Sequence, residues 1–302
     1  MIQESITKRR AGISLLITLS VITAMLSLMG VMFGYISLAQ KKAESKSALI
    51  EANILVEDLK EMLDKNLGKK PSKNKLQLLY STPLFIKDKQ NNFSIAVNCK
   101  PLLNRVPIVW LGLEDNSQYK KKYEFARKLF EQLSEQAEIK DPDALFEILK
   151  KYLKGYSGYF NTPRFIKRKE MTISKEDFFM ILNRYRFEFD DKSVYKLNWD
   201  KYFSFLPLKK EFDGIDFDFL SSDLIPYLFD VDKEYVTENY TMGDIDKFLD
   251  SIGEDKISYK WLFLKTPPAV ECQSSYNFKD RSYGFKFNYL NKRIFDFELQ
   301  NI

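Results

Sequence analysis

The feature that most constrains this chain is an uncharged apolar stretch near its N-terminus, from Ile13 to Leu38. It is longer than the roughly 20 residues that cross a bilayer as a helix. No proline interrupts it, and it is rich in Leu, Ile, Val and Met. A cleaved secretory signal has an apolar region of only about 7–15 residues. The sequence therefore predicts a membrane-spanning helix.

Basic residues flank this stretch on both sides, so charge asymmetry is a weak guide to its orientation. They are Lys8, Arg9 and Arg10 before it, and Lys41, Lys42 and Lys46 after it. The short N-terminal tail and the long C-terminal part favour a cytoplasmic tail and an exported C-terminal part.

A helical pattern continues beyond the apolar stretch. Apolar residues recur at spacings near three and four, as an amphipathic helix requires. They are Leu49, Ala52, Ile54, Val56, Leu59, Leu63 and Leu67. The charged run KKAESKS joins the two patterns without a breaker, and Gly68 and Pro71 supply the stop. One helix from about Ile13 to Leu67 would be roughly 80 Å long.

The absence of histidine excludes most hydrolase chemistry. There can be no Ser-His-Asp triad and no HExxH zinc site. No GxSxG, GxxxxGK[ST] or GxGxxG motif is present either. We therefore expect no enzyme. The formal charge of +5 is spread over the whole length, so no nucleic-acid partner is indicated.

The rest of the chain alternates between strand-like and helical patterns. Short β-like runs, LQLLYST and NFSIAVN, lie between Leu76 and Val97. A helical block follows, with starts predicted at Asp141-Pro142, Ser174, Ser221-Ser222 and Thr241. Strand-like aromatics then return in YKWLFLK, SYNFK, YGFKFNYL and RIFDFEL, with a turn at Asn291-Lys292.

The two cysteines, Cys99 and Cys272, both follow the apolar stretch. An oxidising compartment would allow one bridge between them. We favour the bridge, because an exported reduced pair would be a redox liability. Two buried thiols that behave as small apolar side chains are the alternative.

The N-terminal segment resembles that of type IV pilin-like subunits. Their leaders are short and basic and end in Gly, and KRRAG before ISLLITLSV is similar to such a site, with cleavage between Gly12 and Ile13. Most pilins carry Glu at the fifth mature position, where this chain has Ile17. General secretion pathway protein K, a minor pseudopilin of type II secretion, typically lacks that Glu and carries a large helical insertion. IDFDFLSSDLIPYL and FARKLFEQLSEQAEIKDPDALFEILKKYL also resemble segments of this family.

The resemblance implies an α+β fold in which a pilin-like long N-terminal helix, transmembrane in its first half, packs on an antiparallel sheet interrupted by a large α-helical insertion. The expected segments are a leader at 1–12, the helix at 13–67, the first part of the sheet at 68–118, the insertion at 119–253, and C-terminal strands at 254–302.

The resemblance also implies a function. The chain is expected to be a minor pseudopilin of a type II secretion or related competence system, located at the pseudopilus tip, where it initiates assembly and aids protein export. Implied partners are I-like and J-like minor pseudopilins, the major pseudopilin and a prepilin peptidase. The minor pseudopilins would dock on the helix around Leu49 to Leu63 and the adjoining sheet. The implied location is the inner membrane, as a single-pass protein with a periplasmic C-terminal domain.

An alternative is an unprocessed single-pass envelope protein that acts as a scaffold of a secretion or DNA-uptake apparatus. This alternative predicts an intact N-terminus.

Calcium sites occur in the resembling family, and two acidic clusters offer the hard oxygen ligands that Ca²⁺ prefers. They are Asp213, Asp216 and Asp218, and Asp230, Asp232 and Glu234. Neither cluster has the Gly and terminal Glu of an EF-hand loop. Solvated loop carboxylates are the favoured alternative. No other cofactor is predicted.

Overall fold

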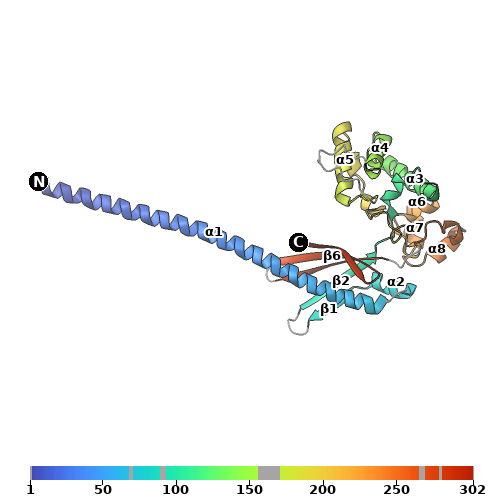
Figure 1. The fold of residues 1–302 in the computed structure, drawn as a ribbon, viewed down its shortest axis with the longest axis horizontal. Coiled ribbons are helices and arrows are strands. Elements are labelled where there is room, and N and C mark those ends of the chain that lie inside the picture. The colour runs from blue at the N-terminus through green and yellow to red at the C-terminus, as the bar shows by residue number, and fades with distance from the viewer. Residues whose placement is uncertain are drawn as a thin grey trace.

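The computed structural model describes residues 2–67, 71–88, 93–155, 171–264, 269–278 and 281–301. A single helix, α1 (Ile2–Leu67), projects far beyond the body of the protein (Figure 1). Its 66 residues correspond to roughly 100 Å at 1.5 Å per residue. The helix passes through the charged run KKAESKS without a break, as the sequence predicts.

The C-terminal half of α1 packs against one antiparallel sheet. The sheet has five strands in the order β1-β2-β5-β6-β7. Their bounds are β1 (Leu84–Asp88), β2 (Phe93–Pro101), β5 (Val270–Phe278), β6 (Arg281–Leu290) and β7 (Arg293–Asn301). Strands β2 and β5 are neighbours in space although the whole insertion separates them in sequence.

Alternating side chains of the sheet form a core beneath α1. The strands contribute Ile95, Val97, Cys99, Cys272, Phe285 and Phe287, among others, and all of these are buried. The residues between them, such as Asn98 and Gln273, are exposed on the opposite face. This period of two matches a sheet that is covered on one face.

Two strand predictions were wrong. LQLLYST lies largely in a helix, α2 (Lys73–Ser81), because Leu76 and Leu79, three residues apart, both pack into the core under α1. YKWLFLK is not a sheet strand either: its start lies in the 3₁₀ helix η7 (Lys256–Tyr259), and Leu262 is buried in the core of the insertion. Short apolar runs fit both periods, so packing decided both cases.

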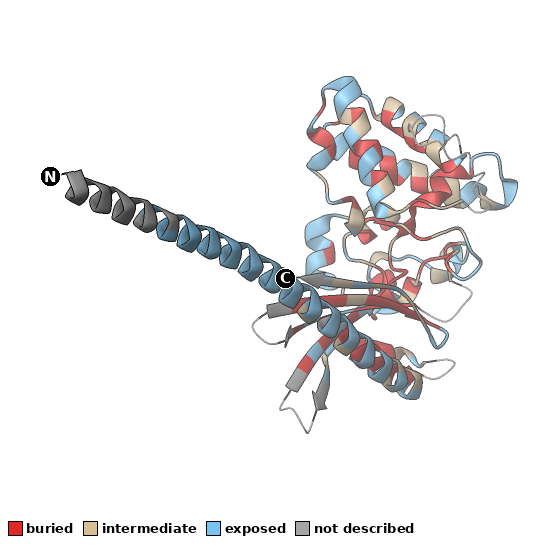
Figure 2. Cartoon of the chain, turned by 60° about the vertical axis from the view of Figure 1, so that its left-hand side comes forward, coloured by how far each residue is buried: buried red, intermediate tan, exposed pale blue. Residues whose placement is uncertain are grey.

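The insertion between β2 and β5 has its own hydrophobic core (Figure 2). It is wider than the predicted range 119–253, since its buried residues run from Val106 to Leu262. Its α-helices are α3 (Lys120–Gln136), α4 (Pro142–Leu153), α5 (Lys175–Phe189), α6 (Ile225–Phe229), α7 (Lys233–Asn239) and α8 (Ile245–Ile252).

Short elements connect these helices. Strands β3 (Val106–Pro107) and β4 (Phe203–Ser204) form a two-stranded parallel sheet. The other 3₁₀ helices among the described residues are η1 (Ile108–Gly112), η2 (Ser117–Tyr119), η4 (Ser193–Tyr195), η5 (Trp199–Lys201) and η6 (Phe217–Phe219). Trp199 stacks on Phe130 at a centroid distance of 5.5 Å, which ties η5 to α3.

Two of the four predicted helix starts, at Asp141-Pro142 and Ser174, are confirmed, whereas α6 begins at Ile225 and not directly after Ser221-Ser222. Ser174 and Asp177 form the predicted capping box of α5, and the Asp141 side chain accepts a hydrogen bond from the Ala144 N–H at the start of α4. The start predicted at Thr241 was wrong, because Gly243 has a φ of 94° that no right-handed helix contains. Helix α8 therefore begins at Ile245.

Candidate functional site

The leader and its cleavage site lie within the first turns of α1. The helix runs without interruption through Gly12 and Ile13. The side chains of residues 1–15 and of Ile17 lie outside the described part of the structure, and those of Lys8, Arg9 and Arg10 are among them. The geometry therefore places this segment on a helix and does not test the predicted processing.

The apolar half of α1 projects away from the folded body. From Thr18 to Leu38 every described residue is exposed, and the largest side chains are about half to two-thirds exposed, as for Leu26 at 63% and Phe33 at 70%. Figure 2 shows the described part of this half, beyond the grey first turns, in the exposed colour. Among the described residues, α1 is the one helix long and apolar enough to cross a membrane by length and composition.

A seam of small residues follows one side of this apolar half. Its members recur at alternating spacings of three and four: Ser20, Thr23, Ser27, Gly30, Gly34 and Ser37. The hydroxyls of Ser20, Thr23 and Ser27 donate to carbonyls four residues earlier on α1. Small residues let two membrane helices approach closely. Our sequence reasoning missed this seam, although its spacing was legible.

The protein's own sheet covers one face of the C-terminal half of α1, which corrects part of the predicted partner surface. Leu55, Val56, Leu59 and Leu63 are buried at 5% exposure or less. They pack on the strands and are not accessible to another subunit, because an amphipathic helix buries its apolar face against the nearest sheet. Leu49, Ile50 and Ile54 remain exposed, by 41%, 62% and 54%.

A polar contact also fastens α1 to the sheet. The Tyr289 hydroxyl of β6 donates to the Asp64 Oδ1 at 2.6 Å. Burial of the phenol and the nearby carboxylate raise the pKa of Tyr289, so the phenol stays protonated and remains a donor.

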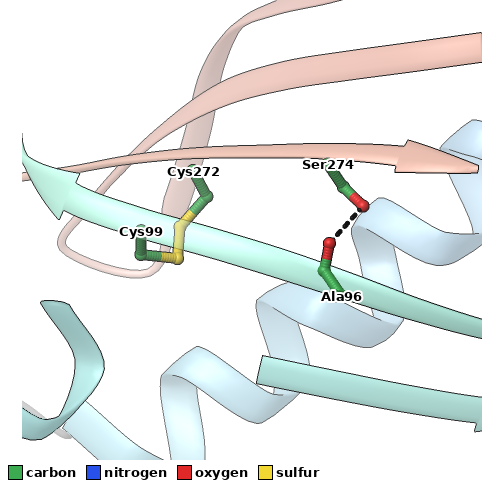
Figure 3. The surroundings of a disulfide bond; sticks show 4 residues. All are labelled: Ala96, Cys99, Cys272 and Ser274. Carbon is green, nitrogen blue, oxygen red and sulfur yellow. Dashed lines mark hydrogen bonds between the residues drawn. A yellow bond between two sulfur atoms is a disulfide. The ribbon is translucent and has the colours of Figure 1, made fainter. Parts of the chain in front are cut away.

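Cys99 and Cys272 form a disulfide between β2 and β5 (Figure 3). They are directly opposite each other in the register, and both are buried beneath α1. Two residues along, the Ser274 hydroxyl donates to the Ala96 carbonyl at 2.8 Å. The disulfide joins the two strands on either side of the insertion.

The two predicted acidic clusters are not gathered into metal sites. Asp213 accepts from Lys122 Nζ at 2.7 Å, and Asp218 accepts from Lys256 Nζ at 2.6 Å. Asp230 ends α6, and Asp232 and Glu234 lie at the start of α7. Across the described ranges, no group of three or more His, Cys, Asp or Glu side chains could hold a metal ion. Lysine ammonium groups therefore lie against two of these carboxylates.

A charged chain connects the insertion to α2. Lys73 Nζ lies 3.2 Å from Asp246, and Lys256 Nζ lies 2.8 Å from the other oxygen of Asp246. These lysines line a cleft of about 320 Å³, together with Asp216 and Asp218. Beside it, the Phe219 ring of the insertion meets the Tyr80 ring of α2 at 4.9 Å, edge to face. Phe219 is buried in the core beneath α1, so it packs the insertion against α1, α2 and the sheet.

Asp216 is the perturbed acid of this junction. Its Oδ2 is buried without a hydrogen-bond partner among the described residues. Burial, reinforced by the charge of Asp218, raises the pKa of Asp216 from 3.8 to about 7.

A second buried carboxylate lies on the sheet face opposite α1. Glu271 is nearly buried, and Lys100 Nζ and Lys286 Nζ lie 2.8 Å and 3.2 Å from its oxygens, with Arg105 at 3.9 Å. Burial raises the pKa of Glu271, but the hydrogen bond from Lys100 and the three positive charges outweigh it, so the net pKa is lowered.

Comparison with known proteins gives one structural likeness. No protein-family model matches the sequence, and no curated protein matches it. A solved structure does match: a chain of the GspK-GspI-GspJ complex from the type 2 secretion system of enterotoxigenic Escherichia coli. The TM-score is 0.58 at 12% identity, and the match covers 87% of this chain and 99% of that chain. The chain therefore shares the fold of that chain, and this fold is the α+β arrangement with a pilin-like long helix that the sequence predicts.

Proposed function

We propose that this chain is a minor pseudopilin of a type II secretion system or of a related competence system. The observation that carries the proposal is the arrangement of three parts: a long helix with an exposed N-terminal half, a sheet that covers one face of its C-terminal half, and an insertion between β2 and β5. The GspK-like fold supports this reading over almost the whole length of the matched chain. The role is one of assembly and not of catalysis.

In this role a prepilin peptidase removes residues 1–12, and Ile13 becomes the N-terminus. The apolar half of α1 lies in the inner membrane, and the domain built on the sheet is periplasmic. The helix later leaves the membrane to pack beside helices of other pseudopilins, I-like and J-like minor subunits and the major subunit. The small-residue seam from Ser20 to Ser37 supports such close packing.

The residue at the fifth mature position supports the proposed tip position. A Glu at that position needs the N-terminal amine of a neighbouring subunit as a partner, because an unpaired carboxylate in an apolar bundle is costly. The first subunit of a filament has no preceding neighbour to supply the amine. Ile17 removes the carboxylate, so this chain suits the first position.

The test is the N-terminus of the full chain expressed with and without a prepilin peptidase, determined by mass spectrometry. We expect a start at Ile13 that depends on the peptidase. A start at Met1 in both strains would overturn the proposal and leave the unprocessed envelope scaffold. The variant Gly12→Leu serves as the matched control and should keep its leader in both strains.

The substitution Ile17→Glu tests the tip role separately. It should leave processing intact and reduce secretion, because it returns an unpaired carboxylate to the bundle.

A further inference from the structure

A pocket of about 510 Å³ lies where the insertion meets the β6–β7 hairpin. Its walls come from two parts of the chain that are far apart in sequence. One part lies within residues 207–212 of the insertion, and the other lies within residues 290–296, which include the end of β6, the turn and the start of β7. Ligand sites commonly have this size and commonly lie between two structural units.

Much of the pocket lining is apolar and held in place. The ring centroids of Phe212 in the insertion and Phe295 in β7 lie 5.7 Å apart. Pro207, Leu290 and Ile294 also line the pocket. Phe212 and Leu290 are buried in a small core that joins the insertion to the hairpin. A large apolar side chain of a ligand can therefore be buried here against walls that are already formed.

One charged side chain at the pocket has no charged partner. The charged residues of the lining are Lys209, Glu211, Arg293 and Asp296. Asp296 accepts a hydrogen bond from Asn288 Nδ2 at 3.2 Å, and Lys209 and Glu211 have interactions of their own. Arg293 is exposed and forms no ion pair within the described part of the chain. A guanidinium group binds a carboxylate through two parallel hydrogen bonds, so a carboxylate is the ligand group that Arg293 favours.

The pocket adjoins a free edge of the sheet. Strand β7 is the last in the order β1-β2-β5-β6-β7. Among the described residues, no backbone hydrogen bond joins β7 to a segment other than β6. Figure 1 shows this C-terminal strand at the margin of the sheet. The N–H and C=O groups on the outer side of β7 are therefore available to an added strand.

A β-bulge separates the pocket end of β7 from the rest of this edge. The pairing of β6 with β7 shifts between Lys286 and Asn288, and Asp296 has a φ of 52°. A bulge bends its strand and interrupts regular pairing. An added segment would pair with residues 297–301 and leave the edge at Asp296, where its next residues meet the pocket.

We propose that this edge and this pocket together bind an extended peptide segment of a partner protein. The segment adds a strand to β7 along residues 297–301, places one large apolar side chain against Phe212 and Phe295, and sets a nearby carboxylate on Arg293. Main-chain hydrogen bonds supply affinity in such strand addition, and the pocket supplies the sequence preference. The inference does not depend on the proposed function, because a pseudopilin and an unprocessed envelope scaffold would have the same edge and pocket.

The first experiment selects ligands from a phage library of random linear peptides. The library is panned on the full chain in lipid nanodiscs, after depletion on empty nanodiscs. We expect enrichment of peptides that have a large apolar residue within two positions of Asp or Glu and an adjoining stretch rich in β-branched residues.

Two charge variants are panned in parallel. Arg293→Glu should lose the acidic peptides, because it places a carboxylate against a carboxylate. Lys292→Glu is the matched control and should retain them, since Lys292 is exposed and adjacent but does not line the pocket. Formation of the Cys99–Cys272 disulfide in both variants checks that the sheet is intact.

A synthetic copy of an enriched peptide tests the added strand. N-methylation of the peptide backbone removes N–H donors, and only alternate residues of an added strand direct their N–H groups toward the neighbouring strand. Methylation of one alternate set should raise the Kd, measured by fluorescence anisotropy on the full chain in nanodiscs, by about tenfold or more. Methylation of the other set should leave the Kd nearly unchanged.

Three results would each overturn the inference: no enrichment, enrichment that the two charge variants affect equally, or equal effects of the two methylated sets. None of these results bears on the N-terminus of the chain. The test of the proposed function therefore stands apart from this one.

Discussion

Removal of the disulfide is the perturbation whose magnitude follows most directly from the structure. We consider the double variant Cys99→Ala with Cys272→Ala. The bridge spans a sequence separation of 173 residues, which includes the whole insertion. A cross-link that closes a long loop reduces the conformational entropy of the unfolded chain, and the effect grows slowly with loop length.

For a separation of 173 residues, the chain-entropy relation corresponds to about 5 kcal/mol at 25 °C. A typical domain has a free energy of unfolding of about 5–15 kcal/mol, so the loss would be a third of it or more. The full amount applies only if the insertion unfolds together with the sheet. If the insertion keeps its own core while the sheet unfolds, the disordered loop is much shorter and the loss is smaller.

The assay is equilibrium unfolding in guanidinium of the full chain in detergent, followed by tryptophan fluorescence and by far-ultraviolet circular dichroism. We expect a large fall in the unfolding midpoint of the double variant. Wild-type protein unfolded in the presence of a reductant should match it. The control is Ser274→Ala, which removes a hydrogen bond between the same two strands and should cost about 1 kcal/mol. A double variant no less stable than Ser274→Ala would refute the reasoning.

Three further predictions concern the carboxylates and the junction. Because the pKa of Glu271 is lowered in the folded protein, its carboxylate should stabilise the fold above the ordinary pKa of 4.5, and this stabilisation should be lost as the pH falls through the lowered pKa. In Glu271→Gln, the midpoint of urea unfolding should therefore fall less steeply with decreasing pH in the acid range. The pKa of Asp216 is raised from 3.8 to about 7, so stability should fall as the pH rises between these values, and Asp216→Asn should be more stable than wild type above pH 7 in the same titration; an unchanged midpoint there would contradict the burial argument. Phe219→Ala should cost about 3–5 kcal/mol, because it empties a buried site beside Tyr80, and limited proteolysis should then cut between the insertion and the sheet faster than in wild type.

The comparison of sequence and structure is clearest at three places. The capping box at Ser174 and Asp177 was predicted because it depends on residues three apart. The turn at Asn291 and Lys292 was also predicted, because turn formation depends on neighbouring residues; both residues adopt positive φ, 48° and 66°. By contrast, α2 was mistaken for a strand because nothing within LQLLYST distinguishes a helix from a strand until Leu76 and Leu79 meet the sheet.

The same distinction between local and long-range contacts applies to the candidate site. Several features belong to a single helix: the apolar half of α1, the small-residue seam and the absence of Glu at position 17. Features of a single helix can be recognised from the spacing of residues in the sequence. The covered face of α1 required the sheet, since only the packing separates the buried Leu59 from the exposed Ile54.

Residue spacing alone predicts one long helix, apolar in its first half and amphipathic in its second, followed by an α+β body with a helical block. These features depend on the order and spacing of residues close together in the chain. Three further features depend on the packed fold: β2 and β5 are neighbours, Lys122 and Lys256 bind the carboxylates of Asp213 and Asp218, and one face of α1 remains uncovered. Those outcomes depend on contacts between residues far apart in sequence, whose formation is decided by the packing of the whole core.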